Sequence, residues 1–163
     1  MAIIKPNNNT ISAITALPAA IPTGKVLQTV SATSVSQTST TSTSFVATNL
    51  KATITPSSSS NKIIILVTGD LYNEGSEKHT SMTVYRGGVS SGTNIGHSTY
   101  GFADTFAVGG GNISPGAAVK EDSPSTTSAT LYEVAVKVND SSSAGYFGVN
   151  NTMTSIVLME IGA

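Results

Sequence analysis

The segment KIIILVTG, residues 62–69, is the most apolar stretch of the chain and decides its fold class. Its five consecutive apolar residues, Ile63 to Val67, are mostly β-branched, which suits an extended, pleated strand. Such a run is far shorter than the about 20 residues that a membrane-spanning helix requires. We therefore predict a central β-strand that is buried on both faces, in a protein that does not insert into a membrane.

Similar short segments continue on both sides of this strand, separated by residues that favour turns. The serine cluster Ser57–Ser60 precedes it, and Gly87-Gly88 turns the chain after an expected strand at residues 81–86. The other expected strands are residues 26–32, 44–54, 102–108, 117–120, 129–138, 146–149 and 153–161. About nine or ten strands at this spacing, without a helical period, predict an all-β fold, an antiparallel β-sandwich or jelly roll.

The last expected strand is apolar on both of its faces. Ile156 and Leu158 alternate with Val157, Met159 and Ile161. Because a two-layer fold buries only one face of such a strand in its own core, the second face predicts a further interface. A homo-oligomer is the simplest source of that interface.

Composition excludes several functional classes. Serine and threonine supply 47 of the 163 residues, only 10% are charged, and the formal net charge is −1. Eight scattered basic residues make no electrostatic surface for nucleic acid. The absence of cysteine excludes disulfides, zinc ribbons and thiol nucleophiles. A hydrophobic fraction of 39% nevertheless allows a folded domain with an uncharged, hydroxyl-rich surface.

The first 24 residues differ from the rest, because Pro6, Pro18 and three consecutive asparagines interrupt any signal-peptide pattern. A short helical turn after Asn9 or Thr10, or an extended arm on another protein, are both compatible with this stretch. We predict an attachment arm at residues 1–24, followed by the β-sandwich at residues 25–163. The apolar residues expected to contact the partner are Ile3, Ile4, Ile11, Ile14, Leu17 and Ile21.

Two groups of residues are candidates for chemistry. Asp70, Glu74, Glu77 and His79 lie close in sequence and provide oxygen and nitrogen ligands, but they lack the EF-hand spacing. A solvated polar loop is the favoured interpretation, and whether the loop holds a metal is left open. His97 precedes Asp104 by seven residues, but we assign no serine nucleophile to this pair.

The tyrosines offer a third possibility, because aromatic rings bind ligands by stacking. Tyr72, Tyr85 and Tyr100 are suitable residues for stacking on sugars, although core or edge positions are the default expectation for them. We therefore predict a non-enzymatic protein with no catalytic residues, no cofactor and no assigned metal site.

Several segments taken in order carry a resemblance. They are GKVLQTVSAT, TSTSFVATNLKATITPSSSSNKIIILVTG, VYRGGVSSGTNIG, EDSPSTTSATLYEVAVKV and SIVLMEIGA, preceded by the leader NTISAITALPAAIPTGKVLQ. Together they resemble small bacteriophage virion proteins, described as fibre or structural proteins and common in cyanobacterial and marine phages. The resemblance covers roughly residues 10–163. The hydrophilic stretch Asn73–Thr80 departs from the usual pattern, and we expect it to lengthen one loop.

The resemblance implies a β-rich, homotrimeric, non-enzymatic module on the outer surface of the phage particle. Its implied partners are further copies of itself, other virion proteins of the tail or capsid, and a host cell-surface receptor. A fibre or knob anchored by the N-terminal arm is the first interpretation. A capsid decoration, or cement, protein is the alternative, and a secreted sugar-binding or adhesin module is a third.

Overall fold

The structure is a computed structural model that describes residues 24–163, and these residues form two packed antiparallel sheets. The six-stranded sheet contains β1 (Val26–Ser34), β2 (Thr38–Thr40), β4 (Lys62–Asn73), β8 (Asn112–Asp122), β10 (Gly145–Phe147) and β11 (Thr154–Ile161). The five-stranded sheet contains β3 (Val46–Ile54), β5 (Lys78–Arg86), β6 (Thr93–Asn94), β7 (Ala103–Ala107) and β9 (Thr130–Val138). A single 3-10 turn, Val149–Asn151, is the only helical element in this part of the chain.

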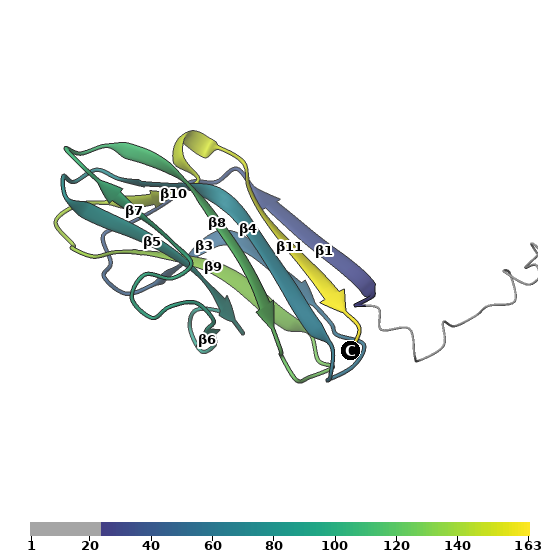
Figure 1. Ribbon diagram of the computed structural model, residues 1–163. Helices are drawn as coiled ribbons and strands as arrows, with labels where there is room; N and C mark the ends of the chain where they lie inside the picture. Colours follow the sequence, from purple (N-terminus) through teal and green to yellow (C-terminus); the bar gives the residue numbers. More distant parts are fainter. Residues whose placement is uncertain (1–23) are drawn as a thin grey trace, which may run out of the picture.

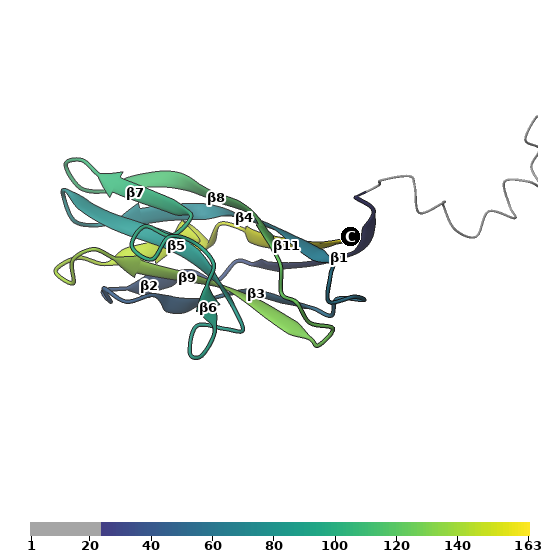
Figure 2. The same ribbon diagram turned by 60° about the horizontal axis from the view of Figure 1, so that its bottom comes forward.

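The strand pairings are nested, which identifies a jelly roll. β5 pairs with β7, β4 with β8, β3 with β9, and β1 with β11, so that the chain resembles one long hairpin rolled into two layers. This eight-strand pattern gives the sheet orders β8-β4-β11-β1 and β3-β9-β5-β7. Figure 2 shows β8 and β4 in one layer and β9 and β3 in the other. The prediction of an all-β antiparallel sandwich is confirmed.

The strand predicted at residues 62–69 is central, but it is buried on one face only. It extends to Asn73 and pairs with β8 on one side and with β11 and then β10 on the other. Ile63, Ile65 and Val67 point into the core, whereas Ile64 and Leu66 lie on the outward face and are partly exposed. The residues of this apolar run therefore alternate between the core-facing side and the outward side of one sheet, and only the core-facing side is buried.

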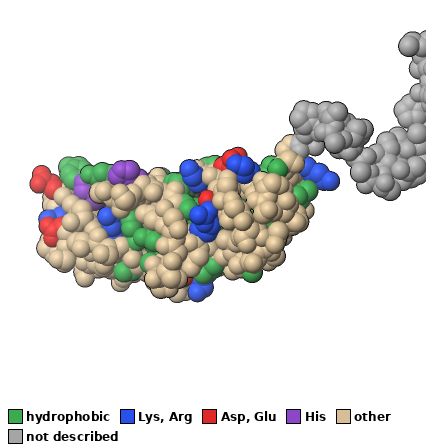
Figure 3. All heavy atoms as spheres, turned by 90° about the horizontal axis from the view of Figure 1, so that it is seen from below, with side chains coloured by type: hydrophobic (Ala, Val, Ile, Leu, Met, Phe, Trp, Pro, Cys, Tyr) green, Lys and Arg blue, Asp and Glu red, His purple; other side chains and the backbone are tan. Residues whose placement is uncertain are grey.

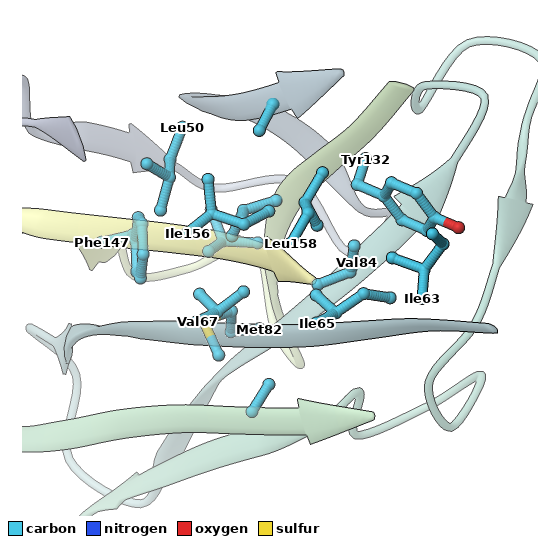
Figure 4. Packing of buried hydrophobic residues seen from close by; sticks show 14 of the residues in the cluster. Leu50, Ile63, Ile65, Val67, Met82, Val84, Tyr132, Phe147, Ile156 and Leu158 are labelled. Carbon is cyan, nitrogen blue, oxygen red and sulfur yellow. The ribbon is translucent and has the colours of Figure 1, made fainter. Parts of the chain in front are cut away.

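The core lies between the two sheets and consists of the inward side chains of both (Figure 4). Its large, fully buried members include Leu50, Ile63, Ile65, Met82, Tyr132, Phe147, Ile156 and Leu158. Burying a side chain of this size stabilises the fold by about 1.5–3 kcal/mol. The period-two alternation of these strands is what separates the inward from the outward residues.

One predicted feature differs from the structure. The stretch Asn73–Thr80 was expected to lengthen a loop, but Asn73 ends β4 and Lys78 begins β5, so only residues 74–77 lie between strands. Residues 38–40, in a serine- and threonine-rich tract, form the edge strand β2 on β10. Hydroxyl-rich segments can pair in a sheet because main-chain hydrogen bonds do not depend on apolar side chains.

The two ends of the sandwich differ in what they carry (Figure 1). The proximal end holds the start of β1 and the C terminus, because Val26 and Lys62 both pair with Ile161. The distal end holds β10 and the end of β4, where Asn73 pairs with Gly145. Among residues 24–163, no helix is long and apolar enough to cross a membrane.

Candidate functional site

The distal end carries a groove on the outward face of the six-stranded sheet. Tyr146 of β10, Tyr72 of β4 and Ile113 of β8 are direct cross-strand neighbours and form one row across three strands. The alternation of β4 turns Leu71 and Asn73 inward, which places Tyr72 outward. The groove has a volume of about 340 Å³ and is lined by Gln37, Tyr72, Glu74, Ile113, Tyr146, Val149 and Asn150.

The two tyrosine rings form an angled apolar wall. Their centroids are 5.5 Å apart and the ring planes are inclined by 52°. The hydroxyl of Tyr146 donates a short hydrogen bond to Oε1 of Glu74. This hydrogen bond raises the pKa of Tyr146 above its ordinary value, so the hydroxyl stays protonated and keeps Glu74 in position. Ile113, which is 50% exposed, continues the apolar surface on the other side of Tyr72.

A turn held by Asp70 builds the opposite wall. The Asp70 carboxylate accepts hydrogen bonds from the main-chain N–H of Val149 at 2.7 Å and from the hydroxyl of Thr152 at 2.8 Å. Asn150 has a φ of 54°, in the left-handed region, and its main-chain N–H donates to Oε1 of Gln37 at 3.0 Å. These contacts attach the turn after β10 to β4 and to the segment before β2.

The four residues predicted as possible metal ligands have separate partners. Asp70 holds the turn at Val149, and Glu74 accepts from Tyr146. His79 contacts Asp104 through Nδ1 at 2.5 Å, while Glu77 lies in the loop between β4 and β5. No three His, Cys, Asp or Glu side chains of residues 24–163 gather in a way that would hold a metal ion.

The candidate pair His97 and Asp104 is also not assembled. Asp104 bonds His79 instead, and its other oxygen accepts from the Ser81 hydroxyl at 2.6 Å. Because Ser81 contacts the carboxylate and not the imidazole, these residues lack the base that activates a serine nucleophile. His97 accepts two main-chain N–H groups through Nδ1 and stacks on Tyr100 at 5.7 Å.

The three tyrosines considered for stacking have different environments. Tyr72 lines the groove, Tyr85 packs edge-on against Phe45, and Tyr100 lies with the histidines. Figure 3 shows the histidines beside hydrophobic side chains toward the distal end, on a face that is mostly neither charged nor hydrophobic. The sequence indicated Tyr72, but not Tyr146, because only the strand register brings the two together.

A second surface feature lies on the same outward face, nearer the proximal end. Val119, Leu66 and Val157 are cross-strand neighbours on β8, β4 and β11. Val119 is 71% exposed, and the other two are partly exposed. This aliphatic row includes one of the outward residues of the last strand from which the sequence predicted a further interface.

The proximal corner contains a buried carboxylate that the sequence did not single out. Glu160 of β11 points inward and is 0% exposed. It accepts hydrogen bonds from the side chains of Gln28 and Asn61, each at 2.6 Å, and from the main-chain N–H of Ser57 at 2.6 Å. Burial alone would raise the pKa of Glu160, but these hydrogen bonds outweigh it and lower the pKa to about 2.

The six apolar residues predicted for the attachment arm, Ile3, Ile4, Ile11, Ile14, Leu17 and Ile21, lie outside the described residues. The arm and its contacts therefore stay a prediction. The described chain reaches the proximal end at Gly24, beside the Glu160 corner.

Comparison with known proteins gives only distant similarities. No family model matches the chain, and no curated protein matches it either. Among solved structures, it is similar to the VP2 subviral particle of infectious bursal disease virus, with 13% identity, a TM-score of 0.36 and coverage of 83% of this chain. It is also similar to T=1 particles derived from that virus, with 13% identity, a TM-score of 0.38 and 91% coverage. The Gx strain of the virus gives 14% identity, a TM-score of 0.36 and 90% coverage.

The chain spans about two fifths of the length of these proteins, with coverage of 40%, 40% and 41% of them. At these scores the similarity assigns neither a family nor a role.

Proposed function

We propose that this chain is a non-enzymatic structural protein of a bacteriophage particle, with its proximal end attached and its distal end directed outward. In this proposal it is a homotrimeric fibre or knob-type module, anchored by residues 1–24 and able to contact the host. The proposed orientation of the protein on the particle is based on where the chain enters the sandwich. β1 begins at the end opposite the groove, so an anchor preceding β1 leaves the groove accessible.

The resemblance of the sequence segments supports the particle role. Those segments form structural elements of the jelly roll: residues 24–33 contain most of β1, residues 121–138 contain β9, and residues 155–163 contain most of β11. Jelly rolls occur in viral capsid domains, but also in lectins and cupins, so the fold by itself does not select a function. The absence of cysteine and the hydroxyl-rich surface suit a protein that stays folded outside a cell.

The aliphatic row of Leu66, Val119 and Val157 supports self-association. An exposed apolar row on a sheet face is stabilised when a second surface covers it. Analytical ultracentrifugation of the full chain is expected to show a trimer, and Val119→Lys is expected to shift it toward monomer without altering the circular dichroism spectrum. A wild-type monomer at high concentration contradicts the trimer.

The decisive experiment locates the protein in purified particles. Deletion of residues 1–23 should leave a folded, soluble sandwich that no longer joins particles, because β1 begins only at Val26. Loss of folding on this deletion would show that the leader belongs to the core. Absence of the wild-type protein from purified particles would contradict the particle role itself.

The second candidate is capsid decoration. The aliphatic row favours it as much as it favours a trimer, because the same outward face could cover a neighbouring capsid subunit. Copy number separates the two: hundreds of copies per particle indicate decoration, and a few dozen or fewer indicate a fibre. A reconstruction of the particle measures this number directly.

A further inference from the structure

We propose that the distal groove binds a neutral saccharide, with the sugar ring against Tyr72 and Tyr146 and its hydroxyl groups bonded to the polar side chains around them. The inference depends on the proposed function, because only an outward distal end would present the groove to a host surface. It adds the class of ligand and the residues that would recognise it.

The strand register builds the stacking surface. Tyr72 and Tyr146 are paired across β4 and β10, and Ile113 extends the row onto β8. Rings carried by paired strands lose little conformational freedom on binding, since tyrosine has only two side-chain torsions. The C–H face of a sugar ring is apolar and matches such a wall, whereas its hydroxyl rim requires hydrogen bonds.

The polar groups around this wall retain unused bonding capacity. Within residues 24–163, the Tyr146 hydroxyl donates a hydrogen bond to Oε1 of Glu74. The main-chain N–H of Asn150 donates one to Oε1 of Gln37. Oε2 of Glu74, the Tyr72 hydroxyl and the side-chain amide of Asn150 have no partner in this part of the chain. Together these three groups offer acceptors and donors that can bond sugar hydroxyls.

The backbone of the turn fixes where the Asn150 side chain lies. Asn150 and the next residue, Asn151, have φ values of 54° and 62°, and both lie in the left-handed region. Asparagine adopts this region more readily than other non-glycine residues, which suits it to this turn. Asp70 maintains this turn through Val149 and Thr152, which places the Asn150 side chain at the rim of the groove.

The volume of the groove and the charge of its lining residues limit the class of ligand that it can bind. A volume of about 340 Å³ falls at the lower end of small-molecule sites and suits one or two sugar rings rather than a folded protein surface. Glu74 is exposed at the groove, and the lining residues among 24–163 include no basic side chain to pair with an acid. An acidic sugar would meet the Glu74 carboxylate without compensation, so neutral sugars are favoured.

The test uses the full-length protein on an array of neutral and acidic saccharides, followed by calorimetric titration of the best neutral saccharide. Tyr72→Ala is expected to weaken binding by about tenfold or more, the size of one aromatic contact. Asn150→Gly should also weaken it, because glycine retains the left-handed backbone while removing only the amide. Tyr100→Ala is the matched control: Tyr100 is 53% exposed but lies outside the groove, so its loss should leave affinity unchanged.

Two results would overturn the saccharide site. One is that no saccharide on the array binds the wild-type protein more strongly than Tyr72→Ala. The other is that the best saccharide keeps its affinity when Tyr72 and Asn150 are both changed in a protein of unaltered melting temperature. Either result leaves the particle role intact if the wild-type protein is present in purified particles, so the two proposals fail separately. In a final experiment, the free saccharide is added to particles and cells. If the natural ligand is a saccharide on the cell surface and not a soluble sugar, the free saccharide should reduce adsorption of the particles.

Discussion

The two ends of the sandwich use a glutamate in opposite ways. At the proximal corner, Glu160 is fully buried and both of its oxygens accept hydrogen bonds from the protein. At the distal groove, Glu74 is exposed, and a single tyrosine hydroxyl bonds one of its oxygens. A buried charge with all its bonds satisfied holds structure together, whereas an exposed charge with spare capacity can bind a ligand. We therefore expect the proximal end to contribute stability, and the proposed saccharide site places ligand binding at the distal end.

The largest expected effect comes from removing the buried carboxylate. Glu160→Ala removes the fully buried carboxylate that accepts from Gln28, Asn61 and Ser57, and should reduce the free energy of unfolding by about 3 kcal/mol. The matched change at the other end, Glu74→Ala, should alter it by about 0.5 kcal/mol or less. Chemical denaturation of both variants measures the difference. Equal losses would end the distinction between the two ends.

The proximal corner should also be responsible for acid sensitivity. The pKa of Glu160 is lowered to about 2 in the folded protein from an ordinary value of 4.5, so its folded state favours the ionised form. Its stabilising contribution is therefore complete above about pH 4.5 and is lost as the pH falls toward 2. Melting temperatures measured from pH 6 to pH 2 should decline less steeply in Glu160→Gln than in the wild type. A parallel decline in both proteins would assign acid sensitivity to other groups.

A smaller effect is expected from Asp70→Ala, which acts on the distal wall. The change leaves the main-chain N–H of Val149 without its acceptor and should cost about 1–2 kcal/mol. Loosening the turn should also weaken saccharide binding, although Asp70 does not line the groove. Asp70→Asn retains one acceptor oxygen and should be less disruptive in both denaturation and titration. If Asp70→Ala bound saccharide as tightly as the wild type, the turn would not be a positioning element.

The smallest stability change is expected at Asn150→Gly. Glycine adopts a φ of 54° without the steric cost that a side chain brings, so the free energy of unfolding should stay within about 0.5 kcal/mol of the wild type. Saccharide affinity should nevertheless fall. Hydrogen exchange of the main-chain amides after β10 would verify that the turn is retained. A large destabilisation here would mean that the Asn150 side chain has a structural role.

Much of the fold could be read from local patterns, whereas the candidate site could be read only in part. The apolar run at residues 62–69 and the alternation at residues 153–161 predicted strands that the structure contains as β4 and β11. Asp70, Glu74 and His79 were grouped because they are near in sequence, yet each has a distant partner. Asp70 lies on β4, Glu74 in the loop after it and His79 on β5 of the other sheet, so nearness in sequence did not bring these side chains together.

The amino-acid sequence by itself determined the all-β class, the alternation along most of the strands, and the absence of cysteine chemistry, but it wrongly predicted that residues 62–69 are buried on both faces. These properties depend on periods of two residues and on composition, which are local. Only the tertiary structure decided the jelly-roll order and the assembly of the two ends. Glu74 meets Tyr146 across 72 residues, and Glu160 meets Ser57 across 103, because the rolled hairpin joins distant strands. The register between strands results from many weak main-chain and side-chain contacts across both strands, so it cannot be deduced from either segment alone.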